Sequence, residues 1–379
     1  MSRQRTIAAA LQHAATTSRG VRVVEQAGRS LSIPYEAVLR EALAIAGALH
    51  ARGLKPGDHV ALVTPDVREF VRGFFGISVA GLVPVPLCPP SQAGDIPTFA
   101  RQSQHILRAS RAAAVVTTAE VAPLLALDAL PLAPAVLLTD VLAQGPALAA
   151  PVALALQGTA LVQFTSGSTA APKGVVLSHA NIDANANAIG KGLGVTESDV
   201  GVSWLPLYHD MGLIGMLLAA VYARVELILM SPVLFLKRPT AWLEAISAYR
   251  GTISFAPNFA YDLCLRRVKP SQLPTLDLSS WRIAGCGAEP IRAEVLRGFA
   301  ERFAVTGFKA AAFVPSYGLA EHSLAVAFSR DGLKVDQVDA WRLGRDSRAV
   351  PVTNGSPAVR VVGCGRPFPG HDVRIIDED

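Results

Sequence analysis

Helix-type and strand-type hydrophobic patterns alternate along most of the chain, and this alternation restricts the possible fold more than any other feature. Stretches with a helical apolar period are separated by short runs of Val, Ile and Leu. Helices are expected at residues 35–52, 68–80, 181–192 and 240–249, and strands at residues 59–63, 83–85 and 225–230. Because strand and helix patterns in alternation are typical of βαβ units, the sequence predicts an α/β protein with largely parallel sheets covered by helices.

The length and charge of the chain limit its architecture and its partners. With 379 residues, 51% of them hydrophobic, the chain can bury a large core and is too long for one small module. We therefore expect two packed α/β subdomains, at roughly residues 1–160 and 161–328, with connecting and edge structure at residues 122–151. The net charge is +5, and the 35 Lys and Arg residues are scattered among 30 Asp and Glu. No basic run of the nucleic-acid type is present, so no nucleic-acid partner is expected.

The cysteines and apolar runs indicate a cytoplasmic protein. The four cysteines (Cys88, Cys264, Cys286 and Cys364) are far apart and have neither metal-ligand spacing nor the density of a disulfide framework. The apolar stretch at residues 7–11 is too short for a secretory signal. Residues 212–223 form the longest helix-like apolar run, whose length favours a buried helix over a membrane span. We expect no transmembrane segment.

A ten-residue stretch rich in Gly, Ser and Thr, residues 165–174, follows the apolar run at residues 160–164. Backbone N–H groups and hydroxyls in such a turn can bind phosphate, and Lys173 adds a positive charge. The alternative is an ordinary polar turn. The stretch is not a Walker loop, because Lys173 lies between Pro172 and Gly174, and proline has no N–H to offer a phosphate.

Two further segments place polar side chains beside apolar ones. In residues 203–215, His209 and Asp210 adjoin Met211 and Leu213, as expected at the mouth of an apolar pocket. The alternative is a core helix in which the histidine is merely hydrogen-bonded. In residues 315–322, Tyr317 could stack on a planar base and Glu321 could offer an oxygen ligand to Mg²⁺.

The glycines of residues 284–290 precede this last segment, and bare backbone there would let a base lie close to the chain. The alternatives are a tight turn for the glycines, a core position for Tyr317 and a solvated surface position for Glu321. The three segments occur in the order expected for one family, and their joint occurrence by chance is improbable.

Together the three segments resemble the adenylate-forming, AMP-binding superfamily, and residues 203–215 resemble its fatty acyl-AMP ligase branch. The resemblance implies ATP and Mg²⁺ as cofactors and a layered αβαβα large domain. It implies catalytic roles for Lys173, His209 and Glu321, with Glu321 and Thr165 at the metal. The residues implied in phosphate binding are Thr165, Ser166, Gly167, Ser168, Thr169, Lys173 and Gly174. Those implied in adenine binding are Gly287, Ala288, Glu289, Pro290, Ser316, Tyr317 and Gly318. Those implied in the acyl pocket are Tyr208, His209, Met211, Gly212, Leu213, Asn258 and Phe259.

The resemblance also assigns the last part of the chain. Residues 329–360 correspond to an insertion that distinguishes fatty acyl-AMP ligases from acyl-CoA ligases. Val335, Val338 and Trp341 have a spacing that would pack one face of this insertion onto a neighbour. Residues 361–379 would begin a small β-barrel, and the mobile C-terminal domain of the family would be absent.

The implied function is activation of a medium- or long-chain fatty acid with ATP, giving acyl-adenylate and pyrophosphate. The acyl group would then pass to the phosphopantetheine of an acyl carrier protein, or of a fused carrier or synthetase domain, in lipid, polyketide or lipopeptide synthesis. This chain alone would be weakly active or inactive. The alternatives are an acyl-CoA ligase of the same superfamily and a non-catalytic module that binds acyl-adenylate or a partner.

Overall fold

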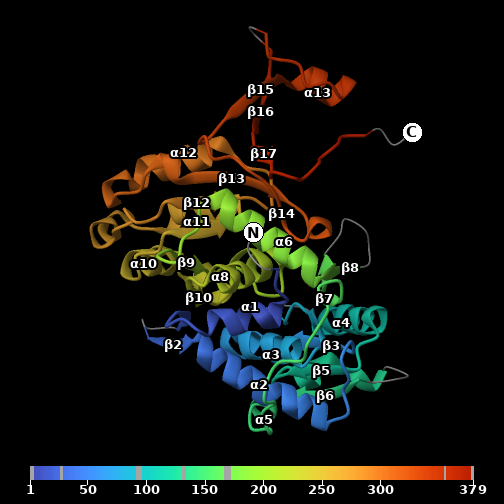
Figure 1. Cartoon of the computed structure of the whole chain (residues 1–379). Helices are drawn as coiled ribbons and strands as arrows, with labels where there is room; N and C mark the ends of the chain where they lie inside the picture. The colour runs from blue at the N-terminus through green and yellow to red at the C-terminus, as the bar shows by residue number, and fades with distance from the viewer. Residues whose placement is uncertain are drawn as a thin grey trace. The chain divides into compact units, whose positions relative to one another are not determined.

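The computed structural model describes residues 4–25, 29–90, 96–129, 134–165, 172–353 and 356–376, and Figure 1 labels its helices and strands. The chain divides into two compact units. Unit 1 comprises Met1–Lys191, Val195–Ser198 and Trp204–Pro232, and unit 2 comprises Gly192–Gly194, Asp199–Ser203 and Val233–Asp379.

Unit 1 contains a four-stranded parallel sheet in the order β4-β3-β5-β6. Its central strand β3 (His59–Val63) carries four residues, Val60 to Val63, that are fully buried, as in a sheet covered on both faces. The other strands are β4 (Val83–Pro86), β5 (Ala114–Thr117) and β6 (Ala135–Leu138), and the helices between and around them are α2 (Tyr35–Ala51), α3 (Val67–Val79), α4 (Ile96–Ser110) and α5 (Thr139–Leu142). The helix–strand alternation expected from the sequence is confirmed here, with strand β3 at the expected residues.

Unit 1 also contains strands β1 (Gly20–Val24), β2 (Ser30–Pro34) and β10 (Glu226–Met230), with β1 parallel to β10 and antiparallel to β2. Helix α1 (Ile7–Ala14) precedes these strands, and helix α6 (His179–Leu193) begins in this unit. The apolar run at residues 212–223 is helical and buried, in the segments α7 (Asp210–Gly212), a π-helical turn (Leu213–Leu218) and α8 (Ala219–Ala223). No helix among the described residues is long and apolar enough to cross a membrane.

Unit 2 contains strands in the order β17-β14-β13-β12-β11-β9. The parallel strands are β9 (Val200–Ser203), β11 (Ile253–Ala256), β12 (Ile283–Cys286) and β13 (Phe313–Gly318), and the antiparallel ones are β14 (Ala325–Phe328) and β17 (Arg366–Pro367). The helices of this unit are α9 (Pro232–Lys237), α10 (Thr240–Ala248), α11 (Asn258–Arg267) and α12 (Ala293–Phe303).

Aromatic side chains form the core of unit 2 and hold helices against the strands. Tyr261 of α11 packs edge-to-face against Trp242, at a centroid distance of 5.5 Å, and donates a hydrogen bond of 2.8 Å to the Gly285 carbonyl. Trp242 Nε1 donates to Ser254 Oγ at 2.8 Å. Because these polar atoms are paired inside the core, α10 and α11 have fixed positions on β11 and β12.

An ion pair between a buried carboxylate and a partly exposed guanidinium joins the amino-terminal ends of β9 and β12. Arg282 donates from Nε and Nη2 to the two carboxylate oxygens of Asp199, at 2.8 and 2.7 Å, and the Asp199 side chain is only 5% exposed. The same guanidinium donates to the carbonyls of Leu193 and Gly194, both at 3.0 Å. This paired geometry is what allows a carboxylate to stay buried.

The segment expected to be an insertion forms an arm made of β15 (Val335–Asp339), α13 (Ala340–Asp346) and β16 (Ala358–Val362), with β15 and β16 antiparallel. We refer to residues 334–353 and 356–363 as the β15–β16 arm. The expected single apolar face is wrong, because Val335 and Val338 lie on a strand, where residues three apart point to opposite sides. Trp341 lies on α13 and is 71% exposed.

The described residues at 361–376 form no closed barrel; they end β16 and contribute β17.

A strand that the sequence analysis does not predict begins at the end of the phosphate-type stretch. β7 (Thr159–Thr165) and β8 (Lys173–Ser178) form an antiparallel hairpin. β8 carries three consecutive apolar residues, Val175, Val176 and Leu177, of which the two β-branched ones favour a strand. Helix α6 therefore follows β8 and not the turn itself.

Candidate functional site

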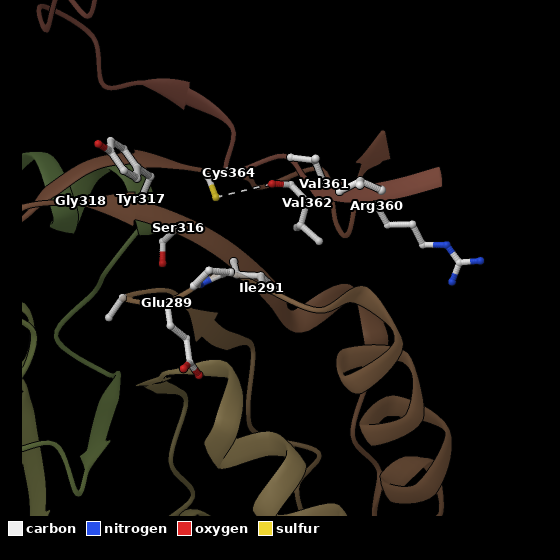
Figure 2. Close-up of a pocket in the computed structure, with 12 residues that line it drawn as sticks. Glu289, Ile291, Ser316, Tyr317, Gly318, Arg360, Val361, Val362 and Cys364 are labelled. Carbon is white, nitrogen blue, oxygen red and sulfur yellow. Dashed lines mark hydrogen bonds between the residues drawn. The ribbon is translucent and has the colours of Figure 1, made fainter. Parts of the chain in front are cut away.

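A cavity of about 550 Å³ lies in unit 2 at the carboxyl ends of β12 and β13. These strands are parallel, with Cys286 opposite Pro315, so the segments that follow them leave the sheet at the same edge. Figure 2 shows the side chains that line this cavity. The lining residues are Ala288, Glu289, Pro290, Ile291, Ser316, Tyr317, Gly318, Val359, Arg360, Val361, Val362 and Cys364.

Six of the seven residues expected at an adenine line this cavity together: Ala288, Glu289, Pro290, Ser316, Tyr317 and Gly318. The seventh, Gly287, is buried behind them. A Cβ on Gly287 would lie 2.7 Å from Ser316 Oγ and 2.8 Å from the Ser316 carbonyl oxygen, so only glycine allows the two segments to approach this closely. Ser316 Oγ donates to the Cys286 carbonyl at 3.0 Å, which fixes the edge of the cavity.

Tyr317 offers an open aromatic surface at this edge. Its side chain follows the buried residues of β13 and is 54% exposed, so a core position is excluded. The cavity is within the size range of small-molecule sites, about 300–1,000 Å³. An exposed ring beside glycine backbone suits a flat, partly apolar ligand such as a nucleobase.

Glu289 connects the cavity to helix α11. Its carboxylate accepts a hydrogen bond of 2.5 Å from the backbone N–H of Phe259, and Asn258 Oδ1 accepts one of 2.9 Å from the N–H of Arg292. In Figure 2 the Glu289 side chain points away from Cys364 and Val362. These two bonds tie residues 289–292 to the first turn of α11, where a negative charge is favoured by the helix dipole. The pairing of Glu289 with Phe259 is not visible in the sequence pattern.

Glu321 lies on a short 3₁₀ turn (Ala320–His322) just after β13 and is exposed. Among the described residues no group of three or more His, Cys, Asp or Glu side chains could hold a metal. Mg²⁺ commonly takes one or two carboxylates together with substrate phosphates, so a single accessible carboxylate fits a Mg²⁺ ion carried by a nucleotide. The neighbouring His322 ring lies 5.0 Å from that of His371, and burial followed by His371 lowers the pKa of His322.

In unit 1, Thr165 and Lys173 lie opposite each other across the β7–β8 hairpin. Lys173 and Gly174 are exposed at the start of β8, with Gly174 packed against Phe164, where a Cβ would come within 3.0 Å of the ring. Ser166, Gly167, Ser168 and Thr169 lie outside the described residues. The hairpin thus places one hydroxyl and one ammonium group at the two ends of the expected phosphate-binding stretch.

His209 and Asp210 form a hydrogen-bonded pair in unit 1. His209 Nδ1 lies 2.7 Å from Asp210 Oδ1, and the same oxygen accepts a 2.7 Å bond from the Met211 N–H. The hydrogen bond to Asp210 raises the pKa of His209, and burial opposes the rise. His209 is 57% exposed at its side chain while Asp210 is 13% exposed, so the imidazole is oriented by a partner and is still open to a ligand.

The other acyl candidates of unit 1 flank this pair in the sequence. Tyr208 is held by its carbonyl, which accepts from Gln163 Nε2 at 2.9 Å, and burial raises the pKa of its hydroxyl, with a smaller effect from Cys88. A Cβ on Gly212 would lie 2.2 Å from the Pro206 carbonyl oxygen, and Leu213 is fully buried. Asn258 and Phe259 belong to unit 2, where Asn258 is buried and Phe259 is 39% exposed.

Sequence reasoning missed the residues of β16 and its turn, Val359 to Val362 and Cys364, which line the cavity. The alternation in Ala358-Val359-Arg360-Val361 followed by Gly363 was a signal for a strand and turn. The resemblance assigns residues 329–360 to an insertion and implies no site residue within them, so this signal alone does not connect the strand to the site.

A family model described as AMP-binding enzyme matches residues 11–379. A putative acyl-CoA synthetase from Caulobacter vibrioides is 37% identical, over 99% of this chain and 66% of that protein. The medium-chain-fatty-acid–acyl-carrier-protein ligase JamA from Moorena producens is 33% identical, over 91% of this chain and 60% of that protein. This chain therefore spans about two thirds or less of the length of these relatives.

Solved structures are similar over almost the whole chain. A fatty acyl-adenylate ligase, from work on the E. coli and L. pneumophila enzymes, matches with a TM-score of 0.94 and 38% identity, covering 98% of this chain and 68% of that one. The L. pneumophila fatty acyl-adenylate ligase in complex with acyl adenylate and pyrophosphate matches with a TM-score of 0.87 and 32% identity, covering 97% and 64%.

Proposed function

The chain belongs to the family of AMP-binding enzymes, and on that premise we propose that it activates a medium- or long-chain fatty acid with ATP, giving acyl-adenylate and pyrophosphate. The observation that carries the proposal is the cavity at the ends of β12 and β13, where six residues expected at an adenine meet. The similar L. pneumophila ligase, which binds acyl adenylate and pyrophosphate, supports the same ligand for this chain.

The nucleotide would occupy the cavity of unit 2. Tyr317 would stack on the base, and the backbone of residues 287–290 would lie along it. Glu321 would hold Mg²⁺, which when bound neutralises charge on the ATP phosphates. We also assign Thr165 to the Mg²⁺ ion. We assign Lys173, Gly174 and residues 166–169 to the polyphosphate of ATP.

The fatty acid would reach the α-phosphate beside His209. Asp210 raises the pKa of His209, which increases the protonated fraction near neutral pH, and a protonated imidazole can donate a hydrogen bond to an oxyanion. Tyr208, Met211, Gly212 and Leu213, together with Asn258 and Phe259, are assigned to the acyl chain. The hydrogen bond from the Phe259 backbone N–H to the Glu289 carboxylate joins residues of the nucleotide and acyl assignments within unit 2.

The reaction would be an attack of the carboxylate oxygen on the α-phosphorus, with pyrophosphate as the leaving group. No covalent enzyme intermediate is needed. The work of the side chains is to hold two anions together and to stabilise the charge that develops on the phosphoryl oxygens, with Lys173 and His209 as the positive groups.

The acyl group would then pass to the phosphopantetheine thiol of an acyl carrier protein, and the protein would act in the cytoplasm. The similarity to a medium-chain-fatty-acid–acyl-carrier-protein ligase supports this acceptor. Coenzyme A is the second candidate acceptor, supported by the putative acyl-CoA synthetase of C. vibrioides. Parallel assays with coenzyme A and with a phosphopantetheinylated carrier protein distinguish the two through the thioester that accumulates.

Calorimetric titration with a long-chain acyl-sulfamoyl adenosine, a stable mimic of acyl-adenylate, tests the proposal. We expect saturable binding that is much weaker for the same nucleoside without the acyl chain, because both halves contribute contacts. Equal affinity for the two compounds would remove the acyl pocket from the proposal, and absence of binding to either would overturn it.

A further inference from the structure

One side of the cavity in unit 2 is built by the β15–β16 arm. The residues involved are Val359, Arg360, Val361 and Val362 of β16, and Cys364 in the turn that follows. β16 is paired along its whole length with β15, Val361 opposite Asp336 and Val359 opposite Val338. The strand is therefore a regular element and presents its side chains in a fixed alternation.

The arm is attached to the strand that carries Tyr317. At its carboxyl end, β16 leads into β17. β17 pairs with β14, with Arg366 opposite Phe328. β14 in turn pairs with β13, with Ala327 opposite Tyr317. Gly363 N–H donates to the Lys334 carbonyl at 3.0 Å, which closes the base of the arm.

Gly365 makes this attachment possible. Its φ is +89°, and a Cβ there would lie 2.1 Å from the Phe328 carbonyl oxygen, so the chain can pass this close to β14 only with glycine. The ladder and this turn together fix β16 relative to Tyr317.

The side chains that β16 contributes are mainly apolar. Val359 and Val361, two positions apart and hence on one face of the strand, are 39% and 47% exposed. The Arg360 guanidinium points away from Ser316 and Tyr317 (Figure 2). Cys364 Sγ donates weakly to the Val362 carbonyl at 3.9 Å, and burial raises the pKa of this thiol, which keeps it uncharged.

The lining also includes residues with polar side chains, namely Glu289, Ser316 and Tyr317. A cavity lined by both apolar and polar residues suits a nucleoside, whose base has apolar faces and whose edge and ribose form hydrogen bonds. Exposed valines in a cavity gain free energy when a ligand removes them from water.

We propose that Val359 and Val361 of the β15–β16 arm contact the nucleoside of the bound adenylate, so that the arm forms part of the nucleotide site. This inference rests on the proposed function. The arm contributes affinity through apolar packing, while the selection of adenine falls to the polar groups and the backbone that line the rest of the cavity. The segment is thereby a binding element for the first half-reaction.

The test is the affinity for adenosine 5′-monophosphate, which contains the nucleotide without the acyl chain, measured by calorimetry on this chain. Val361→Asp places a charge in the apolar wall and is expected to weaken binding about tenfold. Val361→Ala, which keeps the wall apolar, is expected to weaken it about threefold. Val305→Asp is the matched control, because Val305 is a 76% exposed valine of the same unit that does not line the cavity.

Unchanged affinity in both Val361 variants, with binding by the unaltered chain, would overturn the inference and leave the proposed function standing. Absence of binding by the unaltered chain would overturn both. Because Val361→Asp could displace the arm as a whole, photolabelling of the unaltered chain with 8-azidoadenosine 5′-monophosphate gives a second measurement. Label on the peptide containing residues 358–362 supports the inference, and label confined to residues 287–291 and 316–318 contradicts it.

Discussion

At the scale of single residues, the site depends on side chains whose neighbours orient them. His209 is an example, because Asp210 accepts from its ring and is itself fixed by the Met211 N–H. Because the pKa of His209 is raised in the folded state, the His209–Asp210 pair stabilises the fold at pH values below 6.5, the ordinary pKa of histidine. The contribution is lost as the pH rises through the folded-state pKa.

Asp210→Asn is expected to lower the pKa of His209, because the amide still accepts from Met211 but carries no charge. An NMR titration of the His209 ring protons measures this shift. Glu197→Gln is the control, since Glu197 pairs with Arg224 and not with the histidine. A His209 pKa that is the same in Asp210→Asn and in the unaltered protein would show that Asp210 does not set its protonation.

Glu289 gives a second prediction at this scale. Glu289→Ala removes the acceptor for the Phe259 N–H and is expected to destabilise the first turn of α11 by about 1 kcal/mol. Hydrogen–deuterium exchange of the peptide covering residues 258–263 should then be about fivefold faster. Glu289→Gln keeps an acceptor oxygen and should restore most of the protection. Equal exchange in all three proteins would mean that the bond does not protect the helix start.

At the scale of elements, several helices and parallel strands could be predicted from apolar periodicity. The strand β3 and the helices α2, α3, α6 and α10 lie where the pattern placed them, within a residue or two. β8 and β16 were missed for a shared reason. Each is short and largely exposed, so each depends on its partner strand and shows little of the apolar signal that burial produces. For the same reason, the contribution of Val359 and Val361 to the cavity could not be foreseen.

The ion pair of the buried Asp199 at the start of β9 and β12 gives a prediction for the stability of these elements. Arg282→Ala would remove the guanidinium donors from the buried Asp199 carboxylate, which also accepts a 2.7 Å hydrogen bond from Thr252 Oγ1, and we expect a loss of about 3 kcal/mol. Urea unfolding, followed through the buried Trp242 and Trp281, measures it. Arg250→Ala is the matched control, because its partner Asp277 is 54% exposed and no measurable change is expected. Equal losses in the two variants would contradict the role of burial.

At the scale of the whole molecule, the four tryptophans report on separate regions. Trp204 lies in unit 1 and Trp242 and Trp281 in unit 2, each at most 3% exposed, whereas Trp341 on the arm is 71% exposed. Acrylamide is therefore expected to quench Trp341 and to leave the other three largely unaffected.

Trp341→Phe should remove the red-shifted, quenchable part of the emission without changing the unfolding midpoint. Steady-state fluorescence with and without acrylamide measures both. If the quenchable fraction persisted in Trp341→Phe, a second tryptophan would have to be accessible, and the buried positions in the two units would be contradicted.

The two ends of the β15–β16 arm leave the sheet from residues that face each other, Phe328 on β14 and Arg366 on β17. Neighbouring strands are about 4.8 Å apart, so the excursion starts and finishes at almost the same point. The entropy of closing such a loop grows only with the logarithm of its length. Its outer end, at α13 and the residues beyond, can therefore accept extra sequence at little cost to the sheet. That end is a suitable position for a peptide tag or a fluorophore, placed away from the base of the arm and from the strand β16 that lines the cavity.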